Sequence, residues 1–174
     1  ILPEKLAPGD SSNLENQFDR EVQAISQLND HPEEIEKRLK DFAQKMDEPN
    51  LSQLKTKALD YHLQGDDRFL SVYLISLSQK PRAAALLTEI AIAIQPEMKE
   101  PRALEFEKIL RAQAIEGLQN RSHRQQAVDS LSVVVSKLED QYLLDRTERA
   151  LAHFRNGSDT LSEQDQRALE QIVN

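Results

Sequence analysis

The stretch from Asp67 to Gln95 constrains the fold of this chain most, because it is the part that cannot remain in water. It reads DRFLSVYLISLSQKPRAAALLTEIAIAIQ, and on both sides of Lys80-Pro81 its apolar residues recur at steps of three and four. That spacing puts them on one face of an α-helix. The segment before Lys80 is apolar over more than one face, which is typical of a helix covered on two sides. We therefore expect two helices inside a larger helical assembly, and the side chains expected to be most buried are Leu74, Leu77, Leu87 and Ile90.

The remainder of the chain is also of helical type. Only four glycines, seven prolines and no tryptophan occur in 174 residues, whereas Leu, Ala, Glu, Gln and Arg recur throughout. These recurring residues are good helix formers. No run alternates apolar with polar residues for long enough to indicate a strand, and the one ambiguous segment, SVVVS at Ser132–Ser136, still fits a helical period. The predicted fold class is all-α.

Apolar stripes separated by breaks containing Pro, Gly and Asn predict nine helices. The breaks are short, so consecutive helices would pair as antiparallel hairpins. We expect an extended lead-in at 1–12 and then a single helical domain over 13–174, built as stacked hairpins, with an irregular helix bundle as the alternative. The hairpins span about residues 13–47, 51–79, 82–118 and 123–155, and a terminal helix at 161–173 caps the array.

Several breaks carry helix-start signals. Asp30 can accept hydrogen bonds from free amides, and Pro32 suits the first turn of the helix that follows. Asn50 and Gln53 have the spacing of a capping box. Ser122 is a candidate cap for the helix that begins near residue 123.

Two glycines have specific expected roles. Gly65 follows a helical pattern and is expected to end that helix in the positive-φ conformation. Gly117 lies within a helical pattern, where a missing side chain lets a neighbouring helix come close. We favour this packing role over a functional groove at Gly117.

The chain contains a weak internal sequence repeat, which we call the echo. RFLSVYLI at 68–75 aligns with RAQAIEGL at 111–118, since both contain an arginine, a small residue, a β-branched residue and a closing aliphatic residue. RTERALAHF at 146–154 repeats the theme more loosely. The spacing of these segments is close to that of helical repeats.

The echo resembles the HEAT and armadillo class of α-helical repeats over about residues 51–156. In that class the second helix often carries an arginine, and the turn before it often carries an aspartate. Asp67-Arg68 and Asp145-Arg146 match this pattern, whereas Arg111 has no aspartate before it. The resemblance implies a stacked array. A tetratricopeptide-like repeat and a non-repeating bundle stay open, although the tryptophan and glycine-tyrosine positions of the former have no counterpart.

Charge and composition exclude some classes of partner. The net charge of −8 repels phosphate backbones, and no basic cluster with interleaved aromatic residues opposes it, so we expect no nucleic acid. The chain has no cysteine, hence no disulfide or thiolate site, and no apolar run long enough for a membrane span. It begins at Ile1 rather than Met, which slightly favours trimming and export.

No motif predicts catalysis, a cofactor or a metal. The four histidines are His31, His62, His123 and His153. No two of them are four residues apart, which is the spacing of a metal site on one helix face. Three acidic pairs lie at expected helix starts, where capping explains their position without acid–base chemistry. These pairs are Glu33-Glu34, Asp66-Asp67 and Glu139-Asp140. There is no phosphate-binding glycine loop, no nucleophile motif and no EF-hand loop.

These observations favour a non-catalytic scaffold, monomeric or weakly oligomeric, that binds a protein or peptide. The expected groove follows the second helices of the hairpins, at 68–79, 102–118 and 142–154. Its arginines would pair with the preceding aspartates as a structural ladder or receive a partner's carboxylate, and we favour the ladder. The residues of this ladder or groove are Asp67, Arg68, Tyr73, Arg111, Tyr142, Asp145 and Arg146. The main alternative is an accessory or regulatory domain of a larger enzyme or envelope complex, and an enzyme is less favoured.

Overall fold

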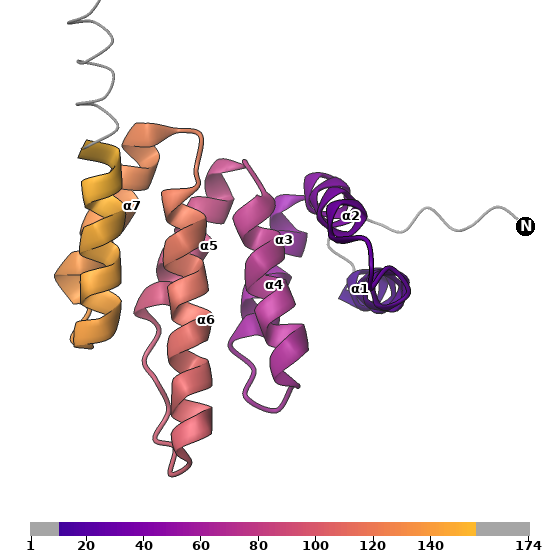
Figure 1. Ribbon diagram of the computed structural model, residues 1–174, viewed down its shortest axis with the longest axis horizontal. Helices are drawn as coiled ribbons and strands as arrows, with labels where there is room; N and C mark the ends of the chain where they lie inside the picture. The colour runs from indigo at the N-terminus through magenta and orange to yellow at the C-terminus, as the bar shows by residue number, and fades with distance from the viewer. Residues whose placement is uncertain (1–10, 156–174) are drawn as a thin grey trace, which may run out of the picture.

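The computed structural model describes residues 11–155, and every regular element in that range is an α-helix (Figure 1). Eight helices follow one another along the described chain. They are α1 (Ser11–Ser26), α2 (Pro32–Gln44), α3 (Glu48–Ala58), α4 (Gly65–Leu77), α5 (Pro81–Ile92), α6 (Pro101–Gln119), α7 (Arg124–Lys137) and an eighth helix over residues 141–155. The expected lead-in and the expected helix at 161–173 lie outside the described residues, except that residues 11 and 12 already belong to α1.

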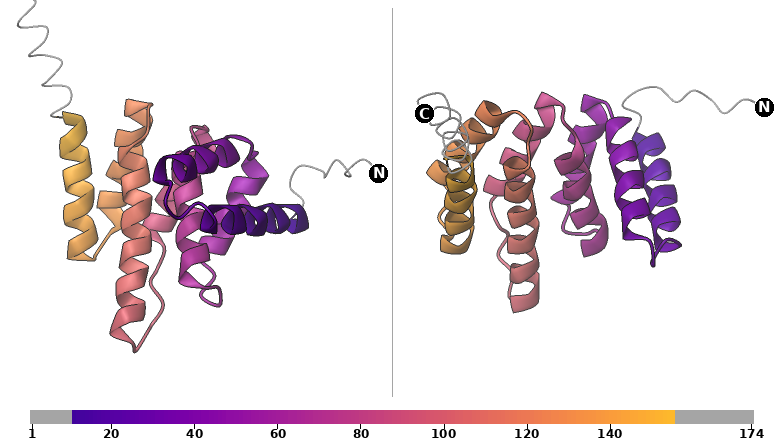
Figure 2. Two further views of the ribbon diagram at one scale, coloured as in Figure 1. Left: turned by 45° about the vertical axis from the view of Figure 1, so that its right-hand side comes forward. Right: turned by 45° about the horizontal axis from the view of Figure 1, so that its top comes forward.

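The helices pack mainly with their neighbours in the chain. α4 contacts its partner α3 and also α2 and α6, while α5 contacts its partner α6 and also α3 and α7. Figure 1 shows the result as two layers, with α4, α6 and the eighth helix in front and α3, α5 and α7 behind. α1 and α2 are seen nearly end-on in Figure 1 and run across the other helices in the left view of Figure 2.

The core is one continuous cluster that extends from α1 to the eighth helix. Leu74, Leu87 and Ile90 are fully buried in it, as the apolar pattern predicts. Leu77 is only half-buried. The helical period places Leu77 on the side of α4 opposite the buried Ile75, where no helix covers it completely.

Helix starts follow the prolines more closely than the expected caps. Proline occupies the first or second position of α2, α3, α5 and α6, where its fixed φ and missing N–H cost nothing. The cap of α3 is Asp47, whose carboxylate accepts from Asn50 N at 2.8 Å, and not the Asn50 capping box. His31 precedes α2 in place of Asp30, and His123 caps α7 in place of Ser122.

Gly65 does not end a helix. α3 already ends at Ala58, and Gly65 is the first residue of α4. The φ angle of Gly65 is not positive. Its missing side chain makes room for the ring of Phe106, which a Cβ would approach to 3.0 Å. The glycine is therefore explained by packing between α4 and α6 and not by turn geometry.

Gly117 has the packing role that its position predicts. A Cβ there would lie 2.4 Å from Ser76 Oγ and 2.8 Å from Ser76 Cβ. Both distances are shorter than atoms tolerate, so α6 can approach α4 this closely only because residue 117 is glycine. The valines of the SVVVS segment lie within α7, which confirms the helical interpretation.

Candidate functional site

The most buried charges among residues 11–155 form a cluster of three side chains. Arg68 Nη1 of α4 donates to Glu107 Oε1 at 2.6 Å, and Arg111 Nη1 donates to Glu107 Oε2 at 2.8 Å. The exposed side-chain fractions are 5%, 0% and 1% for Arg68, Glu107 and Arg111, respectively. Burial alone would raise the pKa of Glu107, but the hydrogen bonds from both guanidinium groups hold this pKa below its usual value.

Each of the two arginines also binds the end of a helix. Arg68 Nε donates to the carbonyl of Ala58 at 2.8 Å, at the end of α3. Arg111 Nε donates to Ala93 O at 2.9 Å and its Nη2 to Ile94 O at 3.2 Å, just beyond α5. Such carbonyls lack an intrahelical partner and carry the negative end of the helix dipole, so a guanidinium stabilises them.

Two further cations bind helix ends in the same way. Arg121 donates to Ser78 O at 2.6 Å and to Lys80 O at 2.9 Å, beyond the end of α4. Lys80 in turn donates to Met46 O, beyond the end of α2. Burial lowers the pKa of Arg121. The contacts of Arg68 and Arg111 join the two helices of one pair, whereas those of Arg121 and Lys80 join the end of α6 to the end of α4 and the start of α5 to the end of α2. All four cations therefore have a structural role.

The arginine ladder therefore differs from the one that the sequence suggests. Its carboxylate is Glu107, and neither Asp67 nor Asp145 forms an ion pair with Arg68, Arg111 or Arg146 within residues 11–155. The backbone carbonyl of Asp67 accepts from Ser71 Oγ at 2.7 Å, and Asp145 accepts from Gln141 Nε2 at 2.7 Å.

Sequence reasoning missed Glu107, Lys80 and Arg121. Glu107 had a usable signal, because it precedes Arg111 by four positions and so shares its helix face. The partners of Lys80 and Arg121 are carbonyls 34 and 43 residues away, and such contacts leave no local pattern.

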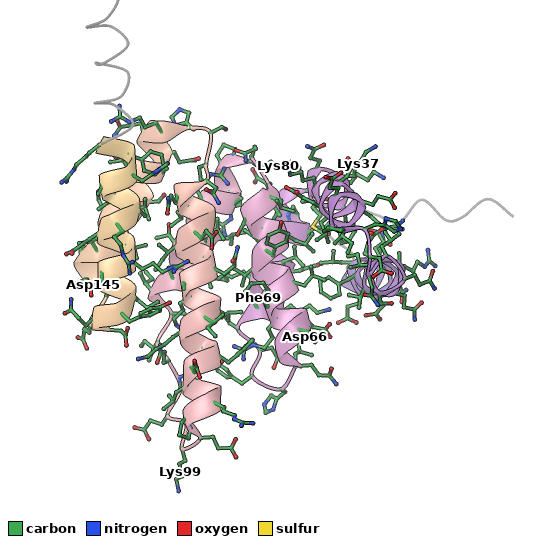
Figure 3. The ribbon with its side chains drawn as sticks, in the orientation of Figure 1. Lys37, Asp66, Phe69, Lys80, Lys99 and Asp145 are labelled. Carbon is green, nitrogen blue, oxygen red and sulfur yellow. The ribbon has the colours of Figure 1, made fainter. Side chains whose placement is uncertain are left out.

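The expected groove corresponds to an outer face of α4, α6 and the eighth helix, which we call the second-helix face and define by Tyr73, Ile109, Glu116, Tyr142 and Arg146. Arg146 Nη2 pairs with Glu116 at 3.4 Å, and both side chains are well exposed. Ile109 and Tyr142 keep 46% and 45% of their surface exposed. Figure 3 shows Phe69 on α4 and Asp145 on the eighth helix at this layer of the molecule.

Tyr73 lies half-buried at the junction of α2, α4 and α6. Burial raises the pKa of its hydroxyl, the carboxylates of Glu36 and Glu116 raise it further, and Lys40 opposes them. Glu36 and Lys40 belong to α2 and are paired at 2.9 Å. Tyr73 is therefore the point at which three helices contribute to one surface.

A cleft of about 480 Å³ opens at the ends of α5 and α7. Ile94, at its edge, is 90% exposed, more than any other large apolar residue among those described. The lining consists of Ala91, Ile92, Ala93, Ile94, Gln95, Arg111, Lys137, Leu138, Glu139, Asp140 and Leu143. The cleft thus combines apolar walls with charged groups of both signs.

Asp140 starts the eighth helix at the border of this cleft. Its Oδ1 accepts from Leu143 N at 3.0 Å, the capping role expected for this acidic pair, and its Oδ2 pairs with Lys108 at 3.0 Å. Burial would raise the pKa of Asp140, but the Leu143 amide and Lys108 together lower it. The carboxylate therefore stays ionised and already has partners.

Neither a metal site nor a membrane-spanning helix is found among the described residues. No group of three or more His, Asp or Glu side chains converges as a metal ion would require within residues 11–155. In the same range no helix combines the length and apolarity needed to cross a bilayer. Among the histidines, His123 Nδ1 accepts from Gln126 N at 3.1 Å, and His153 packs edge-on against Phe154 with ring centroids 5.6 Å apart.

Comparison of the chain with protein-family models, with curated protein sequences and with solved structures gave no match.

Proposed function

We propose that this chain is a non-catalytic, HEAT-like helical-repeat scaffold that binds a segment of another protein along its second-helix face. The observation that carries the proposal is the exposure of Ile109 and Tyr142, at 46% and 45%, on neighbouring helices of one layer. Exposed apolar side chains that form a contiguous patch often mark interaction sites, and we expect these two side chains to belong to one such patch. Tyrosine is favoured in such sites because it combines a large apolar ring with a hydroxyl.

The repetition of arginine contacts supports the repeat architecture. In α3–α4 and again in α5–α6, an arginine of the second helix donates to carbonyls at the end of the first. The contacts among α3, α4, α5 and α6 also follow one scheme, in which first helices meet first helices and second helices meet second helices. This nearest-neighbour scheme is the one that leaves continuous helix faces open for binding.

A peptide-display selection tests the proposal. Peptides selected against the wild-type chain are measured for binding to Ile109→Asp and, as a matched control, to Val133→Asp. Val133 is also an aliphatic β-branched residue and is 42% exposed, but it lies on α7 in the other layer. We expect Ile109→Asp to weaken the selected peptides by more than about tenfold, since a charge would be buried under the ligand, and Val133→Asp to leave them unchanged.

Two results would contradict the proposal. One is a selection that returns no peptide with measurable affinity for the folded wild-type chain. The other is a set of peptides that tolerates Ile109→Asp and the separate substitution Tyr142→Ser as well as it tolerates Val133→Asp. Circular dichroism and the urea midpoint of each variant establish that the helices are intact.

A further inference from the structure

The last hairpin, formed by α7 and the eighth helix, lies at one end of the described molecule in Figure 1 and in both views of Figure 2. In α7, Gln126 Nε2 donates to Pro81 O of α5 at 3.4 Å. In the eighth helix, Arg146 pairs with Glu116 of α6. These contacts identify the side of each helix that is turned toward the preceding hairpin, so the opposite side points away from the rest of the molecule.

The outward side of this hairpin is apolar. Residues about half a helical turn away from Gln126 and Arg146 belong to it, and four of them are aliphatic and half-buried. Leu151 also packs against the edge of the core. The eighth helix is the last element among residues 11–155, so no later helix in that range covers this side. The four aliphatic residues, which we call the terminal face, are Val128, Val135, Leu144 and Leu151.

The sequence after the hairpin contains the apolar stripe that would cover such a face. We call residues 161–173 the terminal segment, in which the helical period places the apolar residues on one side and most charged residues on the other. A helix of this length would extend about 20 Å and so reach both Leu144 and Leu151. The apolar residues of the stripe are Leu161, Ala168, Leu169 and Ile172, and those on the other side include Glu163, Arg167 and Glu170.

We propose that the terminal segment docks as a helix on the terminal face of its own chain, antiparallel to the eighth helix. The link between them, residues 156–160, is short and contains Asn156-Gly157, which suits a reversal between antiparallel helices. A short link also gives the segment an effective concentration of about millimolar at this face, which favours it over a second copy of the chain. The docked helix would turn its polar side to solvent, as the terminal units of helical-repeat proteins do.

The charges near the link also match the terminal segment. Arg155 is exposed, and Arg124 lies next to it, because its guanidinium donates to Phe154 O at 3.2 Å. Glu148, on the same side, offsets one of these two cations. The start of α7 and the end of the eighth helix meet here, so their opposite dipoles compensate. The balance is positive, and Asp165, the one charge within the apolar stripe, would therefore meet a cation when the segment docks.

The test attaches one nitroxide spin label to the full chain, which has no cysteine of its own. The label is carried by Glu170→Cys, on the side of the segment opposite its apolar stripe. Two-dimensional NMR then measures which backbone amides lose intensity because the label is near. We expect amides around Val135 and Leu144, which are far from the link, to lose most of their intensity, and amides of α2 and α3 to keep theirs.

Matched variants separate docking from the mere tethering of the segment. Leu169→Ser removes an apolar residue of the stripe, whereas Gln166→Ser changes a polar residue of the same segment outside the stripe. We expect Leu169→Ser to restore most of the intensity lost around Val135 and Leu144, and Gln166→Ser to leave the losses unchanged. Leu144→Ser on the terminal face should act like Leu169→Ser, with circular dichroism as the check that the helices remain.

Several outcomes would overturn the proposal. Losses confined to residues next to the link would show a tethered segment that does not dock, and losses centred on other helices would place it elsewhere. Equal losses in the Leu169→Ser and Gln166→Ser variants would show that the stripe is not what binds. Losses that persist when the label and the isotope are on different chains would show that a second copy covers the face. None of these results bears on whether peptides bind the second-helix face.

Discussion

The α5–α6 hairpin and the last hairpin place arginines of similar sequence context in opposite environments. Arg111 is 1% exposed and binds Glu107 together with two carbonyls. Arg146 is 37% exposed and has a single long contact of 3.4 Å to Glu116. A buried ion pair is needed for the stability of the fold, because removing one partner leaves the other charge away from water, where solvent cannot stabilise it. A surface pair has little such consequence.

The largest effect is expected from Glu107→Gln. This substitution leaves the buried guanidinium groups of Arg68 and Arg111 without their shared carboxylate. We expect the free energy of unfolding to fall by about 3–5 kcal/mol, measured by urea denaturation followed by circular dichroism. A loss below about 1 kcal/mol would show that the helix-end carbonyls alone hold the two arginines and would remove the contrast with Arg146.

Acid should produce part of the same loss in the wild-type chain. Because the folded state lowers the pKa of Glu107, its ionisation contributes stability above the unfolded pKa of about 4.3, and that contribution disappears as the pH falls through the folded value. We therefore expect the difference in urea midpoint between wild type and Glu107→Gln to be largest near neutral pH and to shrink below about pH 4. A constant difference down to the acid-unfolding range would show that Glu107 is not the group responsible.

A smaller effect is expected from Gly117→Ala, which tests how tightly the interior hairpins pack. The new methyl group would lie 2.4 Å from Ser76 Oγ and 3.1 Å from Leu87 Cδ1. Forcing α4 and α6 apart should cost about 1–3 kcal/mol in urea denaturation. Because the main obstacle is the Ser76 side chain, Ser76→Gly should recover much of this loss in the double variant, whereas simple additivity would show that the two sites do not meet.

The smallest effect is expected from Glu116→Gln. It removes the ion pair with Arg146, whose two side chains are 37% and 48% exposed. We expect a change within about 0.5 kcal/mol, measured by urea denaturation at low and at moderate salt, since solvent screens exposed charges. A loss comparable to that of Glu107→Gln would show that Arg146 is an anchor of the fold like Arg111.

The sequence predicted local structure better than long-range contacts. The three- and four-residue spacing located the eight described helices and most of the buried positions, because periodicity depends only on which face of a helix leaves water. Caps were less predictable. Asp47 and His123 had to compete with neighbouring polar residues, and backbone conformation decides which one acts.

In the candidate sites, too, residues were predicted where the local pattern marked them and missed where tertiary contacts decide. The internal echo identified Arg68 and Arg111 as important, but it assigned them the adjacent aspartate instead of Glu107, which lies 39 residues from Arg68. Tyr142 was identified as a binding candidate and is exposed, whereas nothing in the local pattern marked Ile94 as 90% exposed. Its exposure depends on the path of the chain between α5 and α6, and that path is set by tertiary packing.

The ties between helix ends also bear on how the chain reaches its native state. No side-chain hydrogen bond within residues 11–155 joins positions more than 45 apart. The loops that must close during folding are therefore short, and the entropy lost in closing each one is modest. Chains whose contacts are this local fold rapidly. In the stacked array that we propose for this chain, a pull on the two ends of the described segment would load one hairpin at a time, so the molecule should yield in steps and not all at once.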